Sequence, residues 1–266
     1  MKNEPSGRIA AFFDLDGTLI ARPSLERRFF AELRYRRAIP LRNYFFWLAR
    51  EARLAPRGIQ MMRHANKMYL RGVRTGNNGL RSDEGEPPGK ASGQGRRNVP
   101  RFFPDGVDQV AWHAQEGHSI VLVSGALAPM AQEMALALVV RLAVRGITAS
   151  VAVCATRLEE NDGRWTGRIV GDAMFGEAKA RAVRQMAREK GFPLGLCYGY
   201  GDGLSDRWML EAVGRPTVVN PSEEMERLAA QRGWTVLEWA EKGNLGQSLQ
   251  RTQERDEALL RPRKLA

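Results

Sequence analysis

Residues 12–20 read Phe12-Phe13-Asp14-Leu15-Asp16-Gly17-Thr18-Leu19-Ile20, and this stretch decides the fold. The apolar run 9–11 leads into it, so the pattern predicts a buried strand that ends in two acids, Asp14 and Asp16. Ligands bind at the C-terminal ends of strands in open α/β sheets. Two carboxylates this close repel each other unless a cation or a shared proton offsets the repulsion. Oxygen ligands favour a hard divalent ion, Mg2+ above all. A structural alternative is a turn in which Asp16 caps a following helix.

The composition bounds the class of protein. A chain of 266 residues with 43% hydrophobic residues fits one large α/β domain, or a core domain with an insertion. Cys154 and Cys197 are its two cysteines, which excludes a disulfide framework or a zinc spacing and predicts buried thiols. The N-terminus lacks the apolar stretch of a signal peptide, and no apolar run reaches the ~18–20 residues of a membrane span. A cytoplasmic location is therefore the default expectation.

The positive charge of the chain belongs to one segment. Residues 21–100 hold 18 Lys and Arg against 6 Asp and Glu, whereas the formal net charge of the whole chain is +11. Such a segment suits acidic partners, namely phosphorylated substrates, anionic lipid surfaces or nucleic acid. The structural alternative is a solvated, arginine-rich helical surface.

The same segment predicts a helical insertion. Helical stretches separated by prolines are expected over 24–37, 41–54 and 59–70, with Ser24 as the first N-cap. Their aromatic and methionine stripes, including Tyr44, Phe45, Phe46 and Trp47, are typical of helix–helix core. Residues 75–98 show no hydrophobic period and predict a flexible loop.

From residue 107 onward, strands alternate with helices. The pattern predicts strands over 119–123, 151–153, 165–170, 196–200, 216–219 and 235–237, with a hairpin turn at 161–163. It predicts helices over 107–116, 126–144 (interrupted near Arg141), 177–190, 206–213 and 223–232. Alternation of this kind indicates an α/β fold with a doubly wound, mainly parallel sheet.

Three further sites follow predicted strands or open predicted helices. Ser124 and Gly125 end one strand, which would place the Ser124 hydroxyl at a helix N-terminus, either as a phosphate ligand or as a plain N-cap. Lys179 lies in the first turn of a helix, where the helix dipole disfavours a cation. The lysine is therefore a candidate to neutralise the charge of a phosphate. Asp202 and Asp206 follow a strand within a glycine-rich turn and deliver two more carboxylates to the same edge of the sheet.

The order Asp-x-Asp-Gly-Thr, strand-Ser-Gly, Lys, then Gly-Asp-x-x-x-Asp resembles the haloacid dehalogenase-like hydrolase superfamily. The insertion after the first motif is similar to the helical cap of its phosphoserine-phosphatase-like subgroup of bacterial type. The resemblance implies a Rossmann-like core domain over 1–20 and 100–247, a helical cap over 21–74, a flexible low-complexity loop over 75–99 and a basic tail over 248–266.

The resemblance also implies a role for each site residue. Asp14 would be the nucleophile that forms an aspartyl-phosphate, and Asp16 the general acid and then the general base. Mg2+ would be held by Asp14, the backbone carbonyl of Asp16, Asp202 and Asp206. The phosphoryl group would be bound by Thr18, Ser124, Gly125 and Lys179.

These roles predict a Mg2+-dependent phosphatase, a hydrolase of phosphomonoesters that acts on a small phosphorylated metabolite, phosphoserine-like or lysophospholipid-like. Two alternatives stay open. One is a phosphotransferase that uses the same intermediate, and the other is a phosphate-cleft protein that binds nucleic acid or membrane through the basic insertion. Besides the small substrate, an anionic membrane surface is the partner indicated by the charge, and nucleic acid is the less expected one. Arg22, Arg27 and Arg28 follow the first motif and are candidates to bind a second anionic group of the substrate.

Overall fold

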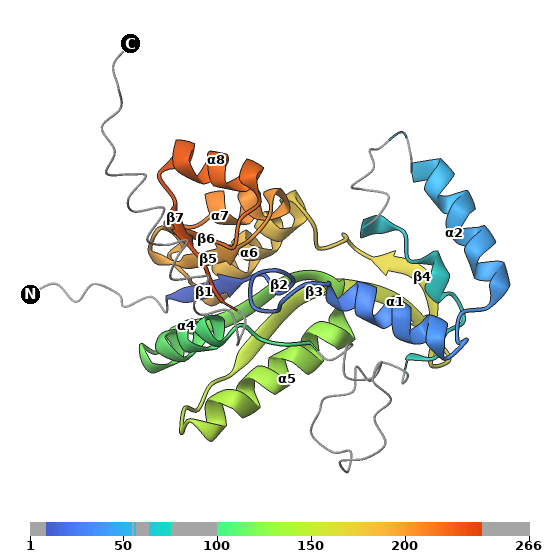
Figure 1. Ribbon diagram of the computed structural model, residues 1–266, viewed down its shortest axis with the longest axis horizontal. Helices are drawn as coiled ribbons and strands as arrows, with labels where there is room; N and C mark the ends of the chain where they lie inside the picture. The colour runs from blue at the N-terminus through green and yellow to red at the C-terminus, as the bar shows by residue number, and fades with distance from the viewer. Residues whose placement is uncertain (1–8, 55, 57–63, 76–99, 241–266) are drawn as a thin grey trace, which may run out of the picture.

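A computed structural model of the protein describes residues 9–54, 56, 64–75 and 100–240 (Figure 1). Its centre is a seven-stranded sheet with the strand order β4-β3-β2-β1-β5-β6-β7. All neighbouring strands pair in parallel except β3 and β4, which form an antiparallel hairpin. The strands are β1 (Ala10–Phe13), β2 (Ser119–Leu127), β3 (Val151–Asn161), β4 (Arg164–Val170), β5 (Tyr198–Gly201), β6 (Arg215–Val219) and β7 (Thr235–Leu237).

Helices cover both faces of this sheet, as the sequence pattern predicts (Figure 1). Phe13 belongs to a buried cluster with residues of α4 (Pro104–Gln115) and α5 (Ala128–Val144). Its neighbour Phe12 belongs to a separate cluster with residues of α6 (Glu177–Lys190) and α7 (Arg207–Glu211). Successive side chains of a strand point to opposite faces of the sheet. Phe12 and Phe13 therefore pack against different helical layers, one on each face of β1. The last helix, α8 (Glu223–Arg232), packs near β6 through the buried Met225.

The strand order places a topological switch point beside β1. From β1 the chain moves outward through β2 and β3, returns across β1 to β5, and then moves outward on the other side. The C-terminal ends of β1 and β5 therefore lie side by side where the winding changes direction, and such a position is where α/β sheets bind ligands. The backbone N–H of Asp14 donates to the carbonyl of Tyr200 at 2.9 Å and joins these two strand ends.

The insertion after β1 begins with two helices at the predicted positions. Helix α1 (Leu25–Tyr35) has Ser24 as its N-cap, with the Ser24 hydroxyl accepting from the N–H of Arg27, and α2 spans Leu41–Leu54. The third predicted helix, 59–70, is wrong at its C-terminal end, because a separate 3-10 turn, η2 (Met68–Leu70), occupies that part. Residues 64 and 65 are helical as predicted. Residues 57–63 and 76–99 lie outside the described residues, and with them the first five residues of that helix and nearly all of the predicted loop.

The insertion returns to the core by pairing with the β3–β4 hairpin. The N–H of Gly72 donates to the carbonyl of Trp165 at 2.7 Å, and the N–H of Trp165 donates to the carbonyl of Val73 at 3.0 Å. The turn of that hairpin has positive φ at Asp162 and Gly163, as a tight two-residue turn requires. The predicted hairpin is thus confirmed, and residues 72–75 extend it on the outer side of β4.

Several predicted boundaries need correction. Strand β2 runs to Leu127 and not to residue 123, because β3 continues to pair with it past a register shift as far as Thr156. Helix α5 passes Arg141 without a break. Strand β5 begins at Tyr198, after a 3-10 turn, η5 (Leu194–Leu196), and α7 begins at Arg207, after another, η6 (Leu204–Asp206). Cys197 is buried as predicted, but Cys154 is only half-buried.

No helix within the described residues is long and apolar enough to cross a membrane.

Candidate active site

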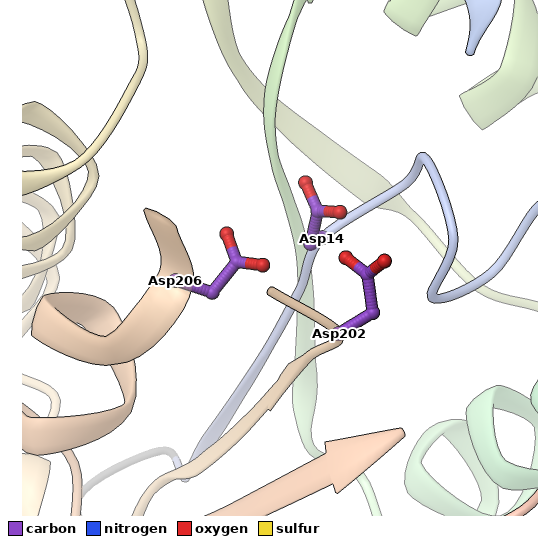
Figure 2. Close-up of side chains that lie close together, drawn as sticks. All are labelled: Asp14, Asp202 and Asp206. Atoms are coloured by element: carbon purple, nitrogen blue, oxygen red, sulfur yellow. The ribbon is translucent and has the colours of Figure 1, made fainter. Parts of the chain in front are cut away.

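Three carboxylates meet at the switch point of the sheet. Asp14 follows β1, while Asp202 and Asp206 follow β5, and one oxygen of each lies within 4.8 Å of the others (Figure 2). All three residues are buried. The structure therefore brings together three of the acids that the sequence predicts at one edge of the sheet. Asp206 also accepts from the backbone N–H of Gly203 at 3.2 Å, which fixes the turn that carries Asp202.

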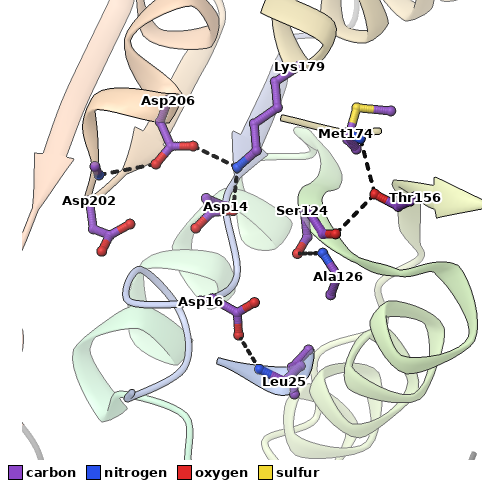
Figure 3. A network of polar contacts seen from close by, with 12 residues as sticks. Asp14, Asp16, Leu25, Ser124, Ala126, Thr156, Met174, Lys179, Asp202 and Asp206 are labelled. Atoms are coloured by element: carbon purple, nitrogen blue, oxygen red, sulfur yellow. Dashed lines mark hydrogen bonds and ion pairs between the residues drawn. The ribbon is translucent and has the colours of Figure 1, made fainter. Parts of the chain in front are cut away.

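Lys179 joins two of these acids. Its Nζ atom lies 2.5 Å from Asp14 Oδ1 and 2.6 Å from Asp206 Oδ1, and its side chain is 4% exposed (Figure 3). Burial opposes the charged form of this lysine, but Asp14 and Asp206 outweigh it and raise the pKa of Lys179. A buried ammonium between two carboxylates explains why a lysine occupies the first turn of α6, where the helix dipole disfavours it.

Burial also changes the protonation of the acids. It raises the pKa of Asp14 well above its ordinary value, although Lys179 opposes this effect. It raises the pKa of Asp202 as well, and the nearby Asp206 adds to this shift. These directions follow from like charges gathered in a place that water hardly reaches. A bound cation would lower the pKa of each group.

Asp16 lies apart from the cluster and contacts the first helix of the insertion. Its Oδ1 atom accepts from the N–H of Leu25 at 2.8 Å (Figure 3). The structural alternative for Asp16 is thus observed in part, because its carboxylate bonds the first N–H of α1 while Ser24 is the N-cap. Burial raises the pKa of Asp16 to about 6, and the Leu25 N–H opposes this rise. A carboxyl group of this kind exchanges a proton near neutral pH.

Ser124 lies inside β2 and is no helix cap, so that alternative is wrong. The helix behind it begins at Ala128, with Leu127 at the N-cap position. The Ser124 hydroxyl is fully buried and accepts from the N–H of Ala126 at 3.1 Å (Figure 3). The hydroxyl therefore fixes the backbone of β2 around Gly125.

Thr156 is a residue of this region that the sequence analysis missed. Its hydroxyl donates to the carbonyl of Gly125 at 3.0 Å and accepts from the N–H of Met174 at 3.0 Å (Figure 3). It thereby connects the end of β2 to the segment that leads into α6. The only sequence signal was a hydroxyl residue directly after the apolar run 151–155.

Thr18 and the three arginines behave differently from one another. Thr18 is completely buried, and its Oγ1 atom has no hydrogen-bond partner within the described part of the chain. Arg22 contacts the cluster, because one of its Nη atoms lies 2.7 Å from Asp202 Oδ2. Arg28 is buried and donates to the carbonyls of Pro23 and Ala21, so it supports the turn before α1. Arg27 is exposed.

Two glycines allow the acids to approach the backbone closely. Gly17 has φ +97°, and a Cβ atom there would lie 2.1 Å from Asp202 Oδ2. A Cβ atom on Gly201 would lie 2.6 Å from Asp206 Cβ. Only residues without a side chain fit at these two positions.

The acidic cluster fits a hard divalent cation. Its donors are carboxylate oxygens, which Mg2+ prefers. Lys179 and Arg22 supply the positive charges that contact these three acids. Lys179 is buried, whereas the side chain of Arg22 is 76% exposed. A cation seated among Asp14, Asp202 and Asp206 would relieve the repulsion that raises their pKa values.

Comparison with known proteins identifies the family. The family model of haloacid dehalogenase-like hydrolases matches residues 11–211, which contain every site residue named above. The chain therefore belongs to the haloacid dehalogenase-like hydrolases, as its motifs predict.

Individual relatives agree with this assignment. A probable phosphatase from Mycobacterium tuberculosis is 34% identical over 246 residues, which cover 89% of this chain and 77% of that protein. A phosphoserine phosphatase from the same species is 28% identical over 243 residues, covering 86% of this chain and 70% of that protein. The crystal structure of a protein of unknown function from Bordetella pertussis Tohama I superposes with a TM-score of 0.63 at 26% identity, covering 87% of this chain and 99% of the other.

Proposed function

We propose that the protein is a Mg2+-dependent phosphatase that hydrolyses a small phosphomonoester through a covalent phosphate on Asp14. Its family and its relatives make it a phosphatase. The observation that carries the finer proposal is Lys179 bridging Asp14 and Asp206 at the switch point, with Asp202 alongside.

Asp14, Asp202 and Asp206 would hold the metal, with the backbone carbonyl of Asp16 as a further oxygen ligand. When bound, Mg2+ offsets the negative charge of these acids and of the incoming phosphate, which otherwise repels a carboxylate nucleophile. Lys179 contributes a second positive charge at the attacking atom, since its Nζ lies 2.5 Å from Asp14 Oδ1. Both charges favour the approach of an anionic phosphate to Asp14.

Asp14 and Asp16 divide the chemistry between them. An oxygen of Asp14 attacks phosphorus, and the bond from phosphorus to the leaving oxygen breaks. Asp16 gives its proton to that leaving oxygen, for which its pKa of about 6 is suited. Water then attacks the aspartyl-phosphate, Asp16 takes up the proton of that water, and inorganic phosphate leaves. Two easier displacements thus replace one difficult displacement.

The transferring phosphoryl oxygens would be bound by Ser124, Gly125, Thr18 and Lys179. The hydroxyl of Thr18 is fully buried and has no hydrogen-bond partner among the described residues, which supports its part in this proposal. Thr156 would act as a positioning residue, since it holds the Gly125 carbonyl and the Met174 N–H at once.

Residues 21–74 would form a cap over this site. Two contacts support the proposal, namely the Leu25 N–H on Asp16 and the Arg22 guanidinium on Asp202. Since residues 72–75 pair with β4, the described part of the insertion is tied to the core at both ends. A phosphoserine-like or lysophospholipid-like substrate is proposed, the first because a relative is named a phosphoserine phosphatase.

Phosphate release tests the proposal. The purified chain is incubated with an aryl phosphate, with either Mg2+ or EDTA, and then with a panel of phosphorylated amino acids, sugars, nucleotides and lysophospholipids. Release that requires Mg2+ is expected, and equal release in EDTA would contradict the metal assignment. A phosphorylated alcohol formed when alcohols are added would instead indicate a phosphotransferase.

A further inference from the structure

Helix α2 exposes an apolar stripe. Leu41, Phe45 and Leu48 are 86%, 71% and 59% exposed. Spacings of four and three residues place the three side chains on one face of the helix. The prediction that its aromatic residues form helix–helix core is therefore wrong for Phe45. Exposed apolar side chains gathered on one helix face form a contiguous patch of the kind that marks an interaction surface.

The opposite face of α2 is the one that packs on the protein. Asn43 is buried there and donates to the carbonyls of Tyr69 at 3.0 Å and Arg71 at 2.7 Å. The Asn66 side chain donates to the carbonyl of Trp47 at 2.9 Å. These bonds fix the rotation of α2 about its axis. The apolar stripe consequently faces away from η2, and α2 lies at the outer edge of the molecule (Figure 1).

Arginines surround the apolar stripe. Residues 34–54 contain six arginines and one glutamate. Arg42, Arg50 and Arg53 belong to α2 itself and are exposed, and they form no ion pair within the described part of the chain. The positive charge of α2 is therefore available to an external anion.

A groove beside α2 adds further positive charge. Its volume is about 680 Å3, and its lining includes four arginines and two glutamates: Arg42, Arg71, Arg164, Arg168, Glu159 and Glu160. Arg42 thus belongs both to the groove and to the helix that carries the apolar stripe. The surface combines apolar insertion with an excess of cationic groups.

We propose that α2 docks on the surface of an anionic phospholipid bilayer. Leu41, Phe45 and Leu48 enter the boundary between headgroups and acyl chains, and the arginines contact headgroup phosphates. An interfacial helix needs this combination of an apolar stripe and flanking cations. A second copy fits less well, because a two-fold contact through α2 would bring the two sets of arginines together. A nucleic acid would engage the arginines and leave the apolar stripe in water.

Vesicle binding tests this proposal on the full chain. Vesicles of phosphatidylcholine alone and of phosphatidylcholine with phosphatidylglycerol are sedimented with the protein at low and high salt. We expect binding to the anionic vesicles that weakens with salt and that is absent with pure phosphatidylcholine. Arg42→Gln/Arg53→Gln should weaken this binding roughly 30-fold, at about one kcal/mol for each charge. Phe45→Ser/Leu48→Ser should weaken it by at least about ten-fold.

A matched control comes from α5, which also exposes apolar side chains. Leu136 and Val140 are 66% and 47% exposed and lie four residues apart. The arginines near them are engaged, since Arg145 pairs with Asp108 at 2.5 Å and Arg141 lies over the Phe102 ring. Leu136→Ser/Val140→Ser should leave vesicle binding unchanged.

Three results would overturn the proposal. The first is no binding to anionic vesicles at low salt. The second is equal binding by the wild type and the Phe45→Ser/Leu48→Ser variant when thermal unfolding shows that both are folded. The third is a wild-type dimer in solution that this variant converts to a monomer without any vesicle binding, which would make a second copy the occupant.

Discussion

Replacing Lys179 by methionine tests the electrostatics of the site most severely. The side chain keeps its length and apolar stem but loses the ammonium that lies 2.5 Å from Asp14 and 2.6 Å from Asp206. Removing one partner of a buried ion pair costs about 3–5 kcal/mol, because the charge left behind stays desolvated. We expect the free energy of unfolding in EDTA to fall by about this amount at pH 8.

The loss should depend on pH and on Mg2+. Lys179 lowers the pKa of Asp14, so its removal raises that pKa further. The folded variant then binds a proton that the unfolded chain does not, and its deficit shrinks as the pH falls from 8 to 5. Saturating Mg2+ should also recover part of the deficit, because a cation among the acids replaces the lost charge. Phosphate release should fall by about 10²–10³-fold even with Mg2+ present.

Urea unfolding in EDTA and in Mg2+, at pH 8 and pH 5, measures these effects. Lys190→Met is the matched control, since Lys190 is exposed in the last turn of the same helix and its loss should cost within about 0.5 kcal/mol. A deficit for Lys179→Met below about 1 kcal/mol in EDTA at pH 8 would refute Lys179 as the counter-charge of the cluster.

Three further predictions concern the same site. Asp202→Asn should leave the protein as stable as the wild type, or more stable, in EDTA at pH 8, because burial disfavours the charged form of Asp202. The variant should lose the rise in melting temperature that Mg2+ gives the wild type, and an undiminished rise would contradict the metal site. Burial raises the pKa of Asp16 to about 6, so near that pH the folded chain binds more protons than the unfolded chain. The free energy of unfolding in EDTA should therefore rise as the pH falls from 8 to 5. Asp16→Asn should flatten this pH dependence, and an equal slope in both proteins would contradict the raised pKa of Asp16. Gly17→Ala should cut phosphate release by at least about ten-fold, because the new Cβ would lie 2.1 Å from Asp202 Oδ2. Gly146 has φ +74°, and a Cβ there would meet no atom of the described residues within 4 Å, so Gly146→Ala is the control for backbone strain alone and should keep full activity.

Much of this site could be predicted from the sequence because its signals are local. An apolar strand that ends in acids is recognisable without knowledge of the fold, and the rule that parallel strand ends share one edge brings Asp14 and Asp202 together. The helix bounds of α2, α6 and α8 were predicted correctly, since local residues mark their ends. Prolines flank α2, glycines flank α6, and α8 lies between Ser222 and Gly233.

The rest depends on contacts between distant residues. Strand β2 continues past Ser124 because β3 keeps pairing with it, and nothing near Ser124 in the sequence reports that partner. The spacing of aromatic residues in α2 predicts an amphipathic helix, but which face is covered depends on Asn43 bonding residues more than 25 positions away. The contact of Arg22 with Asp202 joins residues 180 positions apart, so it too depends on a partner that the local sequence does not reveal.

Asp14→Asn gives the most direct test of the central claim, that the Asp14 carboxylate attacks phosphorus. The amide keeps the shape of the side chain but is no nucleophile. With saturating Mg2+ and an aryl phosphate, we expect phosphate release to fall by at least about 10⁴-fold while the protein stays folded. Full Mg2+-dependent release by Asp14→Asn would contradict it.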